Sequence, residues 1–123
     1  MAVNQVGGAA GSAFGKGCVY VMTYTVRDRR KTINYYKIGC TSREPNVRLQ
    51  EIQDSEINNI TLVGSVTAKK MNGAETAAQN AVKVEGLVKD PARGGATDWF
   101  KGSLTPQKVL DVVRTAVDSH NDT

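Results

Sequence analysis

Two segments dense in β-branched and aromatic residues lie close together near the start of the chain. The first is Cys18–Val26 and the second is Ile33–Gly39, with the strongly polar segment 27–32 between them. Such compositions favour strands, and a short polar connection between them favours a hairpin. We therefore expect antiparallel strands over residues 18–26 and 33–39, joined by a basic loop.

A third strand is expected over residues 60–67, because apolar side chains recur there at even spacing. Ile60, Leu62 and Val66 share one face of an extended chain, which predicts that this face is buried. Gly64 falls on the same face and indicates a bulge or a close neighbour.

Three segments have the apolar spacing or the end signals of helices. Pro45 begins a short one over about 45–53, since its fixed φ suits a first turn. The segment 73–88 carries mainly small side chains at helical spacing, and Thr105 precedes a third helix over about 106–118 as its N-cap. The expected order is ββαβαα, an α/β (α+β) fold in which a three-stranded antiparallel sheet is flanked by helices.

The remaining segments predict connections and ends. Residues 1–16 are rich in Gly, Ala and Ser and indicate a flexible tail, residues 17–118 a single domain, and residues 119–123 a frayed end. Pro and Gly mark 90–95 as a loop, and Asp98-Trp99-Phe100 is expected to anchor the chain back onto the core.

Composition narrows the class of protein. The chain has 123 residues, of which 40% are hydrophobic and 23% charged, which is ordinary for one globular domain. No apolar stretch approaches the roughly 18 residues of a membrane span. Residues 1–16 also lack the apolar core of a signal peptide. We expect an intracellular, cytoplasmic protein, with a phage or virion association left open.

Cysteine and histidine usage excludes several kinds of site. Cys18 and Cys40 are the two cysteines, too few for a disulfide scaffold or a structural zinc site. The hairpin register is expected to set them close together, which leaves a disulfide open. The single histidine, His120, stands near the end of the chain, so Ser-His or Cys-His catalysis has no plausible base.

The charge balance mildly favours a polyanionic partner. Sixteen Lys and Arg against twelve Asp and Glu give a net charge of +4 and a pI of about 9.2. A charged loop can simply be solvated, and Trp99 beside Phe100 favours the core over base stacking. The candidate phosphate contacts are Arg27, Arg29, Arg30, Lys31, Arg43, Lys69 and Lys70.

Short motifs in a fixed order resemble one known family. They are Cys18-Val19-Tyr20 on the first strand, Lys37-Ile38-Gly39 ending the second, Arg48 in the first helix and Glu75 near the start of the second helix. In order and placement they resemble the GIY-YIG nuclease superfamily, in particular its small phage and bacterial branch of T5orf172-like domains, whose second motif reads Tyr-Lys-Ile-Gly. The likeness covers about residues 17–117. Cys18 and Lys37 depart from the first Gly and the Tyr of the superfamily motifs.

The resemblance implies a catalytic set. Tyr20 would help to activate the attacking water, and Lys37 would contact a phosphate as a point charge. Arg48 would contact the scissile phosphate and stabilise charge building on it. Glu75 would be the sole protein ligand of a Mg²⁺ or Mn²⁺ ion.

Two of these residues have structural alternatives. Arg48 lies four residues after Glu44 and three before Glu51, so it could form surface ion pairs along a helix. Asn72-Gly-Ala-Glu75 can also be read as a capping box, with Asn72 as the N-cap and Glu75 accepting from its N–H.

The function that these residues predict is hydrolysis of the phosphodiester bonds of DNA by a metal-dependent endonuclease. Tyr36, packed inward with Ile38, and Gln79, one turn after Glu75, are possible supporting residues. Structured RNA stays open as a substrate, as does a homodimer or a partner that supplies target specificity. The alternatives are a non-catalytic nucleic-acid-binding or assembly module on the same fold and a protein-interaction adaptor.

Overall fold

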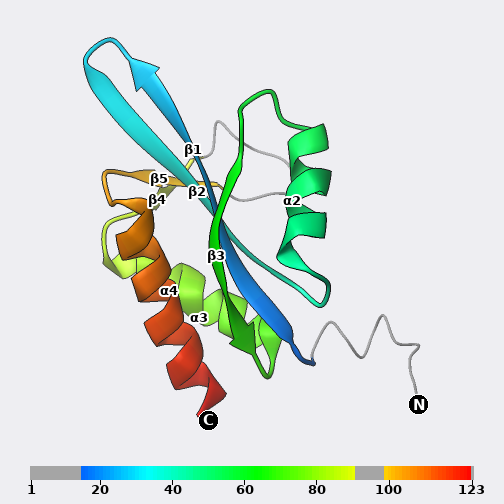
Figure 1. Cartoon of the computed structure of the whole chain (residues 1–123). Coiled ribbons are helices and arrows are strands. Elements are labelled where there is room, and N and C mark those ends of the chain that lie inside the picture. The colour runs from blue at the N-terminus through cyan, green and yellow to red at the C-terminus, as the bar shows by residue number, and fades with distance from the viewer. Residues whose placement is uncertain (1–14, 91–98, 123) are drawn as a thin grey trace.

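An antiparallel five-stranded sheet organises the computed structural model, which describes residues 15–90 and 99–122. The strand order across the sheet is β3-β1-β2-β5-β4. The strands are β1 (Gly17–Asp28), β2 (Lys31–Thr41), β3 (Thr61–Ala68), β4 (Val88–Lys89) and β5 (Phe100–Gly102), and the helices are α2 (Pro45–Asp54), α3 (Met71–Val84) and α4 (Pro106–Asn121). Helix α2 lies against one face of the sheet, and α3 and α4 lie against the other (Figure 1).

The expectation of a three-stranded sheet was wrong. The three predicted strands are present, but β5 adds to the outer edge of β2 and β4 pairs with β5. β4 has two residues and β5 three, so neither is long enough for an alternating pattern to appear in the sequence. Most of the predicted tail, most of the predicted loop at 90–95, and Asp98 lie outside the described residues.

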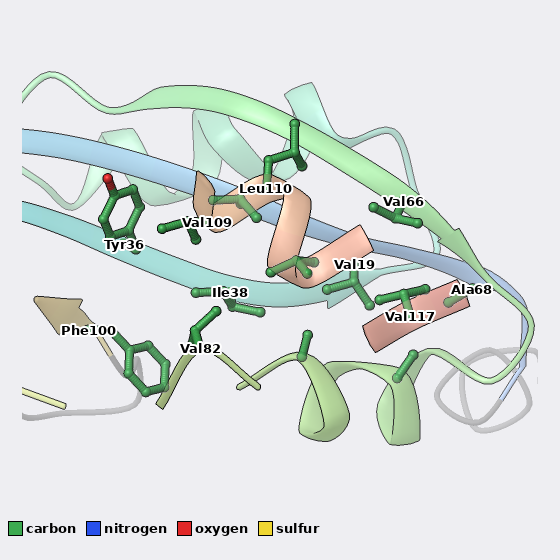
Figure 2. Close-up of a cluster of buried hydrophobic side chains, with 14 of the residues drawn as sticks. Val19, Tyr36, Ile38, Val66, Ala68, Val82, Phe100, Val109, Leu110 and Val117 are labelled. Carbon is green, nitrogen blue, oxygen red and sulfur yellow. The ribbon is translucent and has the colours of Figure 1, made fainter. Parts of the chain in front are cut away.

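Both faces of β1 are buried, which explains why its sequence is almost continuously apolar. Val19 and Val21 belong to the cluster that packs against α3 and α4, which also holds Phe100 (Figure 2). Tyr20 and Met22 point to the opposite face, toward α2. Two core layers thus meet at a single central strand, as in sheets covered on both sides.

Trp99 and Phe100 pack on opposite faces of the sheet, as adjacent residues of an extended segment do. Trp99 is 2% exposed and stands edge-on to Tyr24, with 4.9 Å between ring centroids. Phe100 belongs to the cluster on the helical side. The prediction that Trp99 is a core residue is confirmed.

Gly64 lies where β3 bulges and where α4 approaches. Val21 pairs with Gly64 whereas the next residue, Met22, pairs with Leu62, so the register shifts between them. A Cβ at Gly64 would stand 2.8 Å from a methyl carbon of Leu110. Both the bulge and the close neighbour that the sequence indicated are present.

The helix ends differ from expectation by a few residues. Thr105 caps α4 as predicted, its hydroxyl accepting from the Lys108 N–H. The helix continues past 118 to Asn121, because the Asn121 amide accepts from Lys69 N at 3.0 Å and donates to Thr67 O at 3.0 Å. None of the helices in the described ranges is long and apolar enough to cross a membrane.

The two cysteines are not a cross-strand pair. The register places Val19 opposite Cys40 and Cys18 opposite Thr41, one position away from the expected alignment. Since side chains alternate between faces, this offset sends Cys18 and Cys40 to opposite sides of the sheet. Both are free thiols.

Candidate functional site

The Tyr20 ring crosses over the glycine that ends the Lys37-Ile38-Gly39 motif. Tyr20 on β1 pairs with Gly39 on β2. A Cβ at Gly39 would stand 2.3 Å from the Tyr20 hydroxyl oxygen and 2.5 Å from Cζ, so only glycine leaves room for the ring. The sequence pattern gave no structural reason for this glycine, because the reason lies in a neighbouring strand.

Arg48 reaches the Tyr20 hydroxyl from α2. Ile52 of that helix packs into the same cluster as Tyr20, which brings Arg48, one turn earlier, beside the phenol. The two side chains are hydrogen-bonded. Burial raises the pKa of Tyr20 above 10.0, while the hydrogen bond and the charge of Arg48 lower it by less. The phenol is therefore protonated at neutral pH.

Glu75 approaches the same place from α3, on the other side of the sheet. Its carboxylate is close enough to raise the pKa of Tyr20 by its charge. It also accepts a hydrogen bond from Cys40, whose thiol pKa rises to about 12, first through burial and then through Glu75. A phenol, a guanidinium and a carboxylate from three separate elements thus gather near the end of β2.

The capping-box alternative for Glu75 is wrong. Helix α3 begins at Met71, with Lys70 as its N-cap and no side chain capping it. The helix starts early because Met71 is buried and its N–H donates to Gly15 O at 3.0 Å. Asn72 therefore lies inside the helix, where its Oδ1 is 3.6 Å from the Cys40 thiol.

Gln79 covers the outer edge of β2 next to this cluster. Strand β2 pairs with β5 only at residues 34–36, so in the described ranges no strand covers its edge from Lys37 to Thr41. Gln79 Nε2 donates to Ile38 O there, at 2.9 Å. The backbone of the motif is thereby held from the α3 side.

Lys37 and Tyr36 point to opposite faces, as strand alternation predicts. Tyr36 packs with Ile38 on the helical side, and its hydroxyl donates to Leu104 O. Burial raises its pKa to about 12. Lys37, paired with Met22, shares the face of Tyr20 and is only 7% exposed. Its Cα lies roughly 6–7 Å along the strand from Gly39.

Arg48 also makes the surface ion pair that was its structural alternative. Its Nη1 lies 3.2 Å from Glu51 Oε1. The same oxygen lies 2.8 Å from Nη2 of Arg43, whose backbone N–H donates to Thr41 Oγ1. The two arginines and Glu51 form an exposed network beside Tyr20, and sequence reasoning treated Glu51 only as a pairing partner.

The other basic residues divide into two distant groups. Arg27, Arg29, Arg30 and Lys31 are exposed at the hairpin tip, which projects away from the helices (Figure 1). The tip lies about 26 Å along β1 from Tyr20, at roughly 3.3 Å per residue. Lys69 and Lys70 are exposed between β3 and α3, at the other end of the sheet.

A polar hollow of about 410 Å³ opens beside Arg43, where β1, β2 and β3 meet the start of α2. Hydroxyl groups and two cations dominate its walls. The lining residues are Lys16, Gly17, Cys18, Thr41, Ser42, Arg43, Glu44, Pro45, Ser65 and Thr67.

The carboxylates near the cluster suit a hydrated ion better than a cage of protein ligands. Within residues 15–90 and 99–122, no three His, Cys, Asp or Glu side chains gather as metal ligands. Glu75 offers a carboxylate at the cluster, whereas the nearby Glu51 carboxylate accepts from Arg43 and Arg48. Mg²⁺ keeps several waters and commonly binds through one or two carboxylates plus substrate oxygens, so the single donor fits such an ion.

The structure is thus an α+β domain with exposed basic residues and a phenol–guanidinium–carboxylate cluster at a strand edge. A family model described as the T5orf172 domain matches residues 17–117, and the chain belongs to that family. This domain is associated with nuclease-type proteins. No curated protein and no solved structure matches the chain.

Proposed function

We propose that this protein is a metal-dependent endonuclease of the GIY-YIG type that hydrolyses phosphodiester bonds of DNA. The observation that carries the proposal is the contact between Tyr20 and Arg48 within the electrostatic reach of Glu75. These three residues are far apart in sequence, and the T5orf172 family assignment supports the interpretation of their cluster as a nuclease site.

In the proposed reaction, different residues of the cluster contact the attacking water and the scissile phosphate. Tyr20 orients the attacking water through its hydroxyl, which burial keeps protonated although the nearby Arg48 charge lowers its pKa. Arg48 also braces the scissile phosphate and stabilises charge that builds on it. Lys37 lies on the same face of the sheet as Tyr20 and adds positive charge to the site.

Glu75 is the residue that would hold a Mg²⁺ or Mn²⁺ ion. When bound, such an ion supplies positive charge that stabilises the departing oxygen. The Cys40 thiol interacts with the Glu75 carboxylate and also lies 3.6 Å from Asn72 Oδ1. Gln79, one turn after Glu75 on α3, holds the edge of β2 at Ile38.

Nicking of supercoiled plasmid DNA in Mg²⁺ tests this function. We expect the wild-type protein to nick, EDTA to stop it, and Glu75→Gln and Arg48→Ala each to lower the rate by about 100-fold or more. Glu85→Gln and Arg114→Ala are matched controls, because in the part of the chain that the structure describes both side chains make exposed ion pairs with α4 residues. Activity that persists in the Glu75 and Arg48 variants would show that another protein cuts.

A non-catalytic nucleic-acid-binding module is the second candidate, and the burial of Lys37 favours it. With 7% exposure, Lys37 has little surface to offer a phosphate, and it replaces the tyrosine of the superfamily motif. Salt-sensitive DNA binding without nicking, in Mg²⁺ and in Mn²⁺, would establish this candidate instead.

A further inference from the structure

One carboxylate oxygen joins two arginines at the edge of the proposed site. Glu51 Oε1 accepts from Arg43 Nη2 at 2.8 Å and from Arg48 Nη1 at 3.2 Å. All three side chains reach solvent, with exposures of 54% for Arg43, 35% for Arg48 and 41% for Glu51. An incoming anion can therefore reach both guanidinium groups.

At this oxygen an anion accepts one N–H from each of two guanidinium groups. Arginine presents planar N–H pairs that suit carboxylate and phosphate oxygens alike. The two arginines come from different segments, Arg43 from the chain before α2 and Arg48 from within it. The Arg43 backbone is fixed by Thr41, and Arg48 is fixed by Tyr20. The Arg48 side chain is thus held by Tyr20, and the Arg43 guanidinium is held in the free protein by Glu51.

Charge and space also favour a larger anion than Glu51. Around the network and the adjoining hollow, Lys16, Arg43 and Arg48 face the carboxylates of Glu44 and Glu51, which leaves one net positive charge. The 410 Å³ hollow adjoins Arg43 and carries the hydroxyls of Thr41, Ser65 and Thr67. It offers room and hydrogen-bonding partners for the sugar-phosphate next to the one held by the arginines.

We propose that Arg43 and Arg48 form a two-arginine phosphate clamp, and that Glu51 occupies this clamp in the free protein until a phosphodiester displaces it. The clamp rests on the proposed function and specifies how its site takes a phosphate. Glu51 is a positioning residue: it keeps the two guanidinium groups together and competes with the ligand.

Competition between Glu51 and the ligand determines the direction and size of the expected change in phosphate affinity. Each exposed ion pair that the ligand must break is worth up to about a fivefold change in an equilibrium constant. Glu51→Gln keeps an acceptor of the same shape and removes the charge. We expect it to bind phosphate groups about five- to 25-fold more tightly than the wild type does.

Inorganic phosphate provides the deciding measurement, because it requires neither nucleic acid nor metal. The Nε–Hε signals of Arg43 and Arg48 are followed by NMR during phosphate titration of the wild type, Glu51→Gln and Asp54→Asn. Asp54→Asn removes the same charge from the same helix, where its partner is Gln50. We expect both arginine signals to move together. Their midpoint should fall at a phosphate concentration at least fivefold lower in Glu51→Gln than in the wild type, and within twofold of the wild-type value in Asp54→Asn. Equal midpoints in all three proteins, or equal gains in both variants, would overturn the clamp.

A labelled 20-base-pair DNA duplex in EDTA separates the clamp from the proposed function. We expect anisotropy titrations to show the same gain for Glu51→Gln, and the double variant Arg43→Ala/Glu51→Gln to lose it. If phosphate responds as expected and the duplex binds to none of these proteins, the clamp stands and the DNA function fails. If the duplex binds equally to wild type and Glu51→Gln, the clamp is wrong while DNA binding stands.

Discussion

Replacing Gly39 by alanine tests the close crossing of Tyr20 over β2. The new Cβ would stand 2.3 Å from the Tyr20 hydroxyl oxygen, where ordinary contacts begin at 3.4 Å, so the ring must withdraw by about 1 Å. Tyr20 is 2% exposed and packed among Met22 and Ile52, which leaves no open space for this movement. Overpacking of this kind costs about 1–3 kcal/mol.

Urea unfolding measures the cost. With a slope of about 1–2 kcal/mol/M and a cost of about 1–3 kcal/mol, we expect the Gly39→Ala midpoint to fall by roughly 0.5–3 M. The alanine backbone itself is unstrained, because within the described residues the positive-φ glycine is Gly86 and not Gly39. Any loss therefore reports the clash.

A double-mutant cycle with Tyr20→Leu assigns the clash to the ring. In the Tyr20→Leu background the same Gly39→Ala change should cost less than about half as much, since the nearest atoms in the wild type all belong to Tyr20. An equal cost in both backgrounds, or an unchanged midpoint in Gly39→Ala alone, would refute the crossing.

Three further predictions concern individual groups. Thr105→Ala should lower the free energy of unfolding by about 1 kcal/mol in urea, because the hydroxyl caps α4; no loss would contradict the cap. The folded-state pKa of Tyr36 is about 12 against 10.0 when unfolded, so the folded state holds its proton more tightly. The free energy of unfolding should therefore fall as pH rises from 10 through 12, and it should fall less in Tyr36→Phe. Equal falls in both proteins would contradict this prediction. The pKa of Cys40, raised to about 12, predicts slow alkylation by iodoacetamide at pH 8 in the folded protein and fast alkylation in urea, followed by mass spectrometry; equal rates would refute it.

The sequence predicted the long elements well, because each has a period that packing preserves. The alternation in 60–67 and the helical spacing in 106–118 survive as β3 and α4. Strands of two and three residues carry no period, so β4 and β5 could not be predicted. The one-residue error at the cysteines has a similar origin, since a hairpin register depends on turn geometry as well as on composition.

The candidate site was likewise predictable from the sequence only in part. The motif positions of Tyr20, Arg48 and Glu75 could be found from the sequence, and the capping alternative for Glu75 failed only because Met71 started the helix earlier. Gly39 and Cys40 act through contacts with other elements, and no local pattern records such contacts. The alternation of β2 does place Cys40 on the face of Ile38, and that signal could have directed attention to α3.

The length of the hairpin determines how long a ligand must be to contact both of its ends. Its arginine-bearing tip and the Tyr20 backbone are separated by about 26 Å along β1, which at 3.4 Å per base pair is the rise of roughly eight base pairs. A duplex that contacts both would be held well away from the residues around Tyr20. Shortening the hairpin would then shrink the protected footprint and leave the contacts around Tyr20 untouched.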